Sequence, residues 1–150
     1  MIDWYILLAP LVVLPIILLF AFVGCVPPPL EAVVTTFKLG YDLKKQDSHG
    51  GIANSDIVEI EVTFTAPQFP LASTKKEVTW MGDNATDTFE GSVSHGGEGG
   101  IDCTCHVDLW LSGNKKHPLP DCTALDQKSH VIQFILSFSE ATGLYVWVVS

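Results

Sequence analysis

The sequence predicts an all-β protein, an antiparallel β-sandwich of about seven strands preceded by one N-terminal transmembrane α-helix. The helix is predicted because residues 4–26 contain no charged side chain. The sandwich is predicted because later stretches alternate between apolar and polar residues, with Gly, Pro, Asn and Asp clusters between them. The length of this remainder suits one domain of immunoglobulin-like size, with a jelly-roll order of strands as the alternative.

Residues 1–26 form the predicted membrane anchor. Its 23 uncharged residues span about 35 Å as a helix, slightly more than the roughly 30 Å hydrocarbon core of a bilayer. Trp4 and Tyr5 begin the run, where aromatic rings favour the level of the lipid headgroups. Pro10 and Pro15 each remove one helical hydrogen bond, which suggests a bent helix packed against other protein, with an isolated bent helix as the alternative.

The end of the anchor reads Phe22-Val23-Gly24-Cys25, which resembles the lipobox of bacterial lipoproteins. The resemblance implies that Cys25 is lipidated after cleavage of the preceding segment. However, a secretory signal carries a basic segment before its apolar run, and no Lys or Arg precedes Lys38. We therefore expect a retained helix in which Cys25 is buried in the membrane, with a lipoprotein as the alternative.

Residues 27–30 form a predicted proline stem. Three consecutive prolines end the helix and extend about 9 Å as polyproline II, which sets the distance between the lipid and a domain of residues 31–150. Lys38, Lys44 and Lys45 favour a cytoplasmic domain under the positive-inside rule, but long domains cross membranes largely regardless of charge. The cysteines and the all-β pattern favour an extracytoplasmic domain, periplasmic in a bacterium, and we expect this placement.

Seven strands are expected in the domain, each with one buried face. In the second strand the expected inward residues begin at Val58, and in the fifth His106 lies on the face opposite to the apolar one. The expected strands cover residues 33–43, 58–64, 78–81, 86–93, 103–111, 132–138 and 144–149.

Three cysteines of the domain are candidates for a disulfide. Cys103 and Cys105 share the apolar face of one strand, and either can pair with Cys122 to close a short loop that stabilises by about 3 kcal/mol. The remaining thiol is expected to be buried and inert. A metal site is not expected, because His106 points to the opposite face and the spacing differs from that of zinc knuckles.

No set of residues predicts catalysis. The histidines other than His106 lie at ends of loops or strands, and the glycine-rich segment 96–100 lacks the lysine and the helix of a phosphate-binding loop. The chain carries 17 acidic residues against 8 lysines, a net charge of −9, and no arginine, so nucleic acid is not expected as a partner. We expect a protein that is not an enzyme and that needs no cofactor.

The last expected strand is apolar on both faces. Leu144, Val146 and Val148 on one face are expected to enter the core. On the other face Tyr145, Trp147 and Val149 form a candidate interaction patch, with a central strand covered by loops of the domain as the alternative. These features predict a non-catalytic, single-pass accessory subunit that docks on partner subunits of a larger membrane complex. The alternative is a membrane-tethered module that binds a ligand or a protein.

Overall fold

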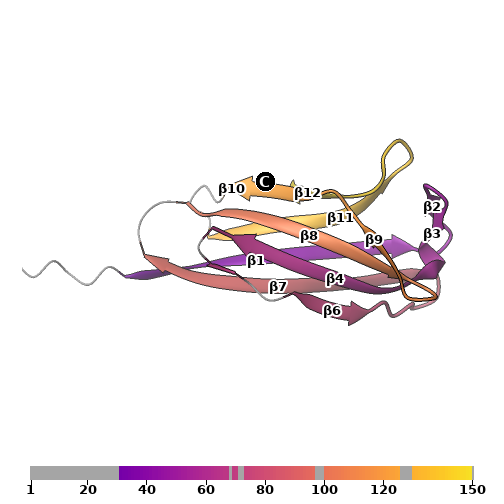
Figure 1. The fold of residues 1–150 in the computed structure, drawn as a ribbon, viewed down its shortest axis with the longest axis horizontal. Coiled ribbons are helices and arrows are strands. Elements are labelled where there is room, and N and C mark those ends of the chain that lie inside the picture. Colours follow the sequence, from indigo (N-terminus) through magenta and orange to yellow (C-terminus); the bar gives the residue numbers. More distant parts are fainter. Residues whose placement is uncertain (1–30, 68, 71–72, 97–99, 126–129, 150) are drawn as a thin grey trace, which may run out of the picture. The chain divides into compact units, whose positions relative to one another are not determined.

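The computed structural model describes residues 31–67, 69–70, 73–96, 100–125 and 130–149 (Figure 1). Residues 32–150 form one compact unit, separate from residues 1–31. The predicted anchor and stem lie outside the described residues. Within the described ranges, no helix combines the length and the hydropathy that crossing a bilayer requires.

The second unit is all-β, as predicted, and its two sheets are rich in antiparallel pairs, as a β-sandwich requires (Figure 1). The four-stranded sheet has the order β12 (Gly143–Val149), β11 (Val131–Ser139), β1 (Ala32–Lys44), β7 (Asn84–Gly96). The six-stranded sheet has the order β10 (Cys122–Leu125), β8 (Asp102–Leu111), β4 (Ile57–Ala66), β5 (Phe69–Pro70), with β6 (Thr74–Glu77) paired to β4 and β9 (Lys115–Pro118) to β8. A small hairpin, β2 (Ser48–His49) and β3 (Ile52–Ala53), precedes the 3-10 turn η1 (Asn54–Asp56).

One pair of strands departs from the predicted antiparallel arrangement. Strands β1 and β11 run parallel, with Thr36 opposite Val131 and Tyr41 opposite Leu136. Alternation of apolar residues identifies a strand but carries no information on the direction of its neighbour. The first strand of the domain is therefore a central strand, held between β11 on one side and β7 on the other.

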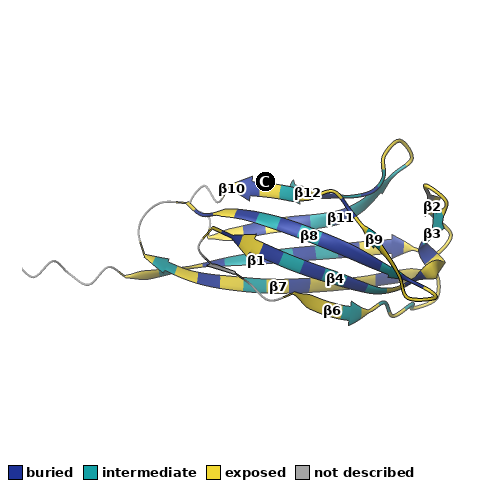
Figure 2. Cartoon of the chain, in the orientation of Figure 1, coloured by how far each residue is buried: buried dark blue, intermediate teal, exposed yellow. Residues whose placement is uncertain are grey.

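A single hydrophobic core fills the space between the sheets, and buried and exposed residues alternate along the long strands (Figure 2). The expected inward residues of β1, β8 and β11 are buried, apart from the half-buried ends of β1 and β11 at Val33 and Phe138. The largest fully buried apolar side chains are Phe37, Phe89, Phe134, Leu39, Leu43, Ile57, Ile60, Leu109 and Leu136.

The prediction that Val58 points inward was wrong. The register of β4 against β8 shifts between Ile57 and Glu59, so this strand carries a β-bulge. Ile60 is buried as predicted, whereas the extra residue places Ile57 in the core in place of Val58, which is 43% exposed. A pattern of strict alternation does not predict a bulge, because the inserted residue turns each preceding side chain of the strand to the other face of the sheet.

The expected strand at residues 78–81 was also misplaced. The strand is β6, four residues earlier, and only the backbone N–H of Val78 extends its pairing, to the carbonyl of Val58. Strand β6 carries the charged residues of an edge strand and so has no apolar period to detect. Strand β9, which carries two lysines, went unpredicted for the same reason, whereas β10 has only four residues and is too short to show a period.

Phe64 of β4 packs against two aromatic rings of the opposite sheet. Its ring centroid lies 5.9 Å from that of Phe37 and 6.1 Å from that of Phe134, both in the opposite sheet. Below the ring is Gly91 of β7, where an added Cβ would lie 3.0 Å from Phe64 Cδ2. The absence of a side chain at this position thus makes room for the ring.

Replacing Gly91 by alanine should destabilise the domain by about 1–3 kcal/mol, the usual cost of overpacking a core. Phe64 is 4% exposed and held between two other rings, so it cannot move aside freely. Gly40→Ala is the matched control, because Gly40 is also a strand glycine and has no atom within 4 Å of the added Cβ. Denaturant unfolding of both variants is the measurement, and equal stabilities would contradict this account of the Phe64 packing.

Candidate functional site

Strand β12 carries the predicted interaction patch at one edge of the four-stranded sheet. Leu144 and Val146 point inward and are buried, while Trp147 is 43% exposed. Tyr145 and Val149 share the outer face with Trp147 and are half-buried. Strand β12 contains no charged residue and no proline, the features that natural edge strands use against unwanted pairing.

The apolar surface continues from β12 onto its neighbours. Ile135 of β11 lies directly opposite Trp147, and Gly40 of β1 lies opposite Ile135 on its other side. Gly40 adds no side chain, and the space above it is open. We name Tyr145, Trp147, Val149 and Ile135 the β12 patch. Ile135 was not predicted, although an isoleucine between the inward Phe134 and Leu136 was a visible break in the alternation.

The opposite edge of the same sheet is protected. Lys76 of β6 reaches across to β7, where its Nζ donates a hydrogen bond of 2.6 Å to the carbonyl of Thr88 and lies 3.1 Å from Asp87 Oδ2. The same ammonium group is 4.8 Å from the ring centroid of Phe89. A lysine placed in this way blocks the pairing of a further strand, so the two edges of the sheet differ in the way expected if one edge docks.

The three candidate cysteines lie together at the other edge of the sandwich, where β10 lies near β12. Cys103 and Cys105 of β8 are buried, Cys122 of β10 is half-buried, and all three are free thiols. Burial raises the pKa of Cys103 to about 12 and also raises the pKa of Cys122. These thiols are therefore poor nucleophiles at neutral pH, and the structure does not test the predicted disulfide.

His106 lies on the outer face of β8, opposite to the cysteines, within a small charge network. Its Nδ1 is 2.5 Å from Asp121 Oδ1, and its Nε2 is 3.2 Å from Asp108 Oδ1. Asp108 is 4% exposed and also binds Lys116 Nζ at 2.7 Å. The hydrogen bond to Asp121 is the main cause that raises the pKa of His106, and burial opposes it. An imidazolium held between two carboxylates ties the outer face of β8 to the segment that leads into β10.

Trp110, on the same outer face, is covered by charged side chains. Its Nε1 donates a hydrogen bond of 3.0 Å to Glu61 Oε2, and Lys75 Nζ lies 4.0 Å from its ring centroid. Lys75 in turn binds Glu59 at 2.5 Å. A tryptophan with its polar atom and its ring face both occupied offers little apolar surface to a partner.

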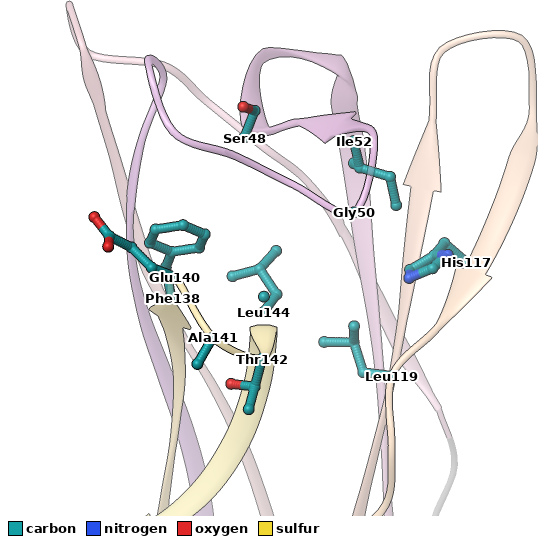
Figure 3. A pocket seen from close by; sticks show the side chains of 11 residues that line it. Ser48, Gly50, Ile52, His117, Leu119, Phe138, Glu140, Ala141, Thr142 and Leu144 are labelled. Atoms are coloured by element: carbon teal, nitrogen blue, oxygen red, sulfur yellow. The ribbon is translucent and has the colours of Figure 1, made fainter.

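A cavity of about 390 Å³ opens at the end of the domain where β1 finishes (Figure 3). Ile52, Leu119 and Leu144 point into it from three different elements, whereas the carboxylate of Glu140 points away (Figure 3). The ring of His117 also lines the cavity (Figure 3). The lining mixes apolar side chains with the polar side chains of Ser48, His117 and Thr142, and a hollow of this kind can take a small ligand.

Trp80 and Gly96 lie apart and do not form one site. Trp80 lines a second cavity, of about 380 Å³, with Ile57 and Val58 among its neighbours. Gly96 ends β7, the strand that begins near Trp80, and so lies one strand length away from it. Among the described residues no group of three or more His, Cys, Asp or Glu side chains could hold a metal ion.

The membrane-anchor residues lie outside the described part of the chain, namely Trp4, Tyr5, Pro10, Pro15 and Cys25.

Asp108 and Asn54 are buried polar residues whose burial was not predicted. The side chain of Asn54 donates a hydrogen bond of 2.9 Å to the carbonyl of Lys44 and so fixes the chain as it leaves β1. Their sequence signal was weak, because Asp and Asn are ordinarily exposed.

Comparison with known proteins identifies no relative. No family model matches the chain, and neither a curated protein nor a solved structure matches it. The function must therefore be argued from the arrangement of the residues themselves.

Replacing Asp121 by asparagine should lower the pKa of His106, because the hydrogen bond that His106 donates to Asp121 is the main cause of its raised value. The raised pKa means that protonated His106 stabilises the fold fully below about pH 6.5 and that this stabilisation is lost as pH rises through the folded-state pKa. The Asp121→Asn variant should lose the stabilisation by protonated His106 at a lower pH than the parent chain does. NMR titration of His106 and unfolding between about pH 5 and pH 9 measure both effects. Asp102→Asn, at an exposed carboxylate of β8, is the control, and identical titrations of His106 in all three proteins would refute the assignment.

Proposed function

We propose that this chain is a non-catalytic accessory subunit of a larger membrane protein complex. In this proposal residues 1–26 are a single transmembrane helix in contact with lipid, residues 27–30 are a rigid stem, and the β-sandwich docks on partner subunits on the extracytoplasmic side. The proposal includes a sandwich whose strands connect in immunoglobulin-like or in jelly-roll order.

The observation that carries the proposal is the β12 patch. Exposed apolar surface with an aromatic centre commonly marks a protein interface, and tryptophan and tyrosine are enriched among the residues that dominate binding energy. Here Trp147 is 43% exposed on an edge strand without charge, in a chain of net charge −9. The protected edge at Lys76 and the covered ring of Trp110 leave β12 as the surface best suited to a partner.

The composition of the β12 patch indicates which kind of surface a partner should have. It should present an apolar surface or an extended strand that can lie beside β12, and it need not carry a positive charge. Another protein subunit of the same membrane meets these requirements. Nucleic acid does not, since the chain has no arginine and an excess of acidic residues.

Replacing Trp147 by lysine should remove the chain from its complex, because a charge would have to be buried at the centre of the interface. The measurement is gel filtration with mass spectrometry of a membrane fraction solubilised in mild detergent. We expect the parent chain to elute with other subunits and the variant to elute alone, with a loss of co-purified subunits of at least tenfold.

Val58→Lys is the matched control, because Val58 is also 43% exposed and lies on the other sheet. This control should stay in the complex. If the parent chain itself elutes alone, or only with a second copy of itself, the accessory-subunit proposal is wrong.

The cavity at the end of β1 supports a second candidate, a membrane-tethered module that binds a small ligand. Strand β1 has 13 residues and extends about 40 Å, so the cavity lies far along the domain from Ala32, where the strand begins. A site at this position would be accessible to molecules in solution. The mixed lining, with Ile52 and Leu119 beside His117, suits a ligand with a small apolar group next to one hydrogen-bonding atom.

NMR titration with a set of small aromatic fragments tests this candidate. Fragments that bind should shift the signals of His117 and Leu144, and Ala141→Trp should abolish the shifts by adding bulk to the lining. Glu77→Gln, at the second cavity, serves as the control. The absence of any shift at millimolar fragment would remove the support for a ligand site here.

A further inference from the structure

Cys105 and Cys122 lie directly opposite each other on neighbouring antiparallel strands. Residues in such pairs have Cα atoms about 4.5–5.5 Å apart and side chains on the same face of the sheet. Disulfides join Cα atoms that are about 4.4–6.8 Å apart. The register of β8 and β10 therefore places these two thiols at the separation that a disulfide requires.

Cys103 does not have this relation to Cys122. Its direct neighbour across the strands is Ala124, and Cys122 is its diagonal neighbour. Diagonal neighbours lie about 7–8 Å apart, beyond the distance at which a disulfide forms without movement of the backbone. The sequence alone left both pairings open, and the strand register favours one of them.

The two thiols differ in their access to solvent. Cys105 is completely buried, whereas Cys122 is half-buried on a four-residue edge strand. An oxidant would therefore reach Cys122 first. Burial raises the pKa of both thiols, so few of them are thiolates in the folded chain. Thiol–disulfide exchange with an oxidant is therefore expected to be slow once β10 is paired with β8.

We propose that Cys105 and Cys122 form a disulfide that ties the edge strand β10 to the central strand β8. The oxidant is the disulfide of a thiol–disulfide oxidoreductase or of glutathione. The Cys122 thiolate attacks one sulfur of the oxidant, which releases one thiol and leaves a mixed disulfide. The Cys105 thiolate then attacks the Cys122 sulfur and releases the second thiol, so that two electrons and two protons pass from the protein to the oxidant.

The bond would matter for docking because β10 lies near β12 across the edge of the sandwich. Cross-linking β10 to β8 limits the opening of this edge and so supports the strand that carries Trp147. In the cell the inference rests on the proposed extracytoplasmic placement, since disulfides persist in oxidising compartments. The pairing itself can be tested without that assumption.

The full chain in detergent should be refolded in a buffer of reduced and oxidised glutathione, alkylated with N-ethylmaleimide, digested and analysed by mass spectrometry. We expect a linkage to Cys122 that persists in Cys103→Ser and is lost in Cys105→Ser and Cys122→Ser. Cys25→Ser in every variant removes the fourth thiol from the exchange. The oxidised protein should also show a Tm several degrees above that of the Cys122→Ser variant. A linkage that persists in Cys105→Ser, or three free thiols after refolding, would overturn the pairing.

A second arm alkylates thiols in intact cells before lysis. A linkage found there would support both the disulfide and the extracytoplasmic domain. Reduced cysteines in cells, from a protein that forms the bond during refolding, would overturn the native disulfide because the domain would then reside in a reducing compartment. The two arms thus separate a failure of the pairing from a failure of the proposed placement.

Discussion

The insertion of Phe64 into the opposite sheet is the constraint on which the rest of this structure depends. Phe64 comes from β4, and its ring packs on Phe37 and Phe134 of the four-stranded sheet above a glycine of β7. Interiors of proteins are packed about as densely as organic crystals, so a ring in this position fixes the separation of the sheets and their relative register. When the two sheets are packed face to face, the outward side chains of each strand form the surface of the domain.

The two open sides of the sandwich are finished differently. On the side of β6 and β7, a lysine of one sheet bonds to the backbone of the other and leaves no apolar edge. On the side of β10 and β12, cysteines and uncharged residues meet instead. This asymmetry is unexpected for a domain that acts alone, because solitary domains blunt both edges of a sheet. It is the reason that we propose β12 as the strand that would dock on a partner.

The long strands could be predicted from the sequence because each has one face in the core. The alternation in β1, β8 and β11 leaves few other arrangements, and the outward position of His106 followed from it. Edge strands such as β6 and β9 have no buried face and hence no period to recognise. The bulge at Val58 and the parallel partner of β1 depend on contacts between distant segments, which local patterns do not contain. In the β12 patch, Trp147 was predictable from its own strand, whereas Ile135 joined it only through the pairing of β11 with β12.

The central position of β1 has a mechanical consequence. This strand begins at Ala32, next to the segment that precedes the domain, and it is bonded to β7 along 13 residue pairs and to β11 along six. Since these bonds lie across the strand, a pull along it from residue 31 would load them in shear, and they would have to break together rather than one after another. A domain tethered at this point would withstand tension from its attachment far better than one whose first strand could peel from a sheet edge.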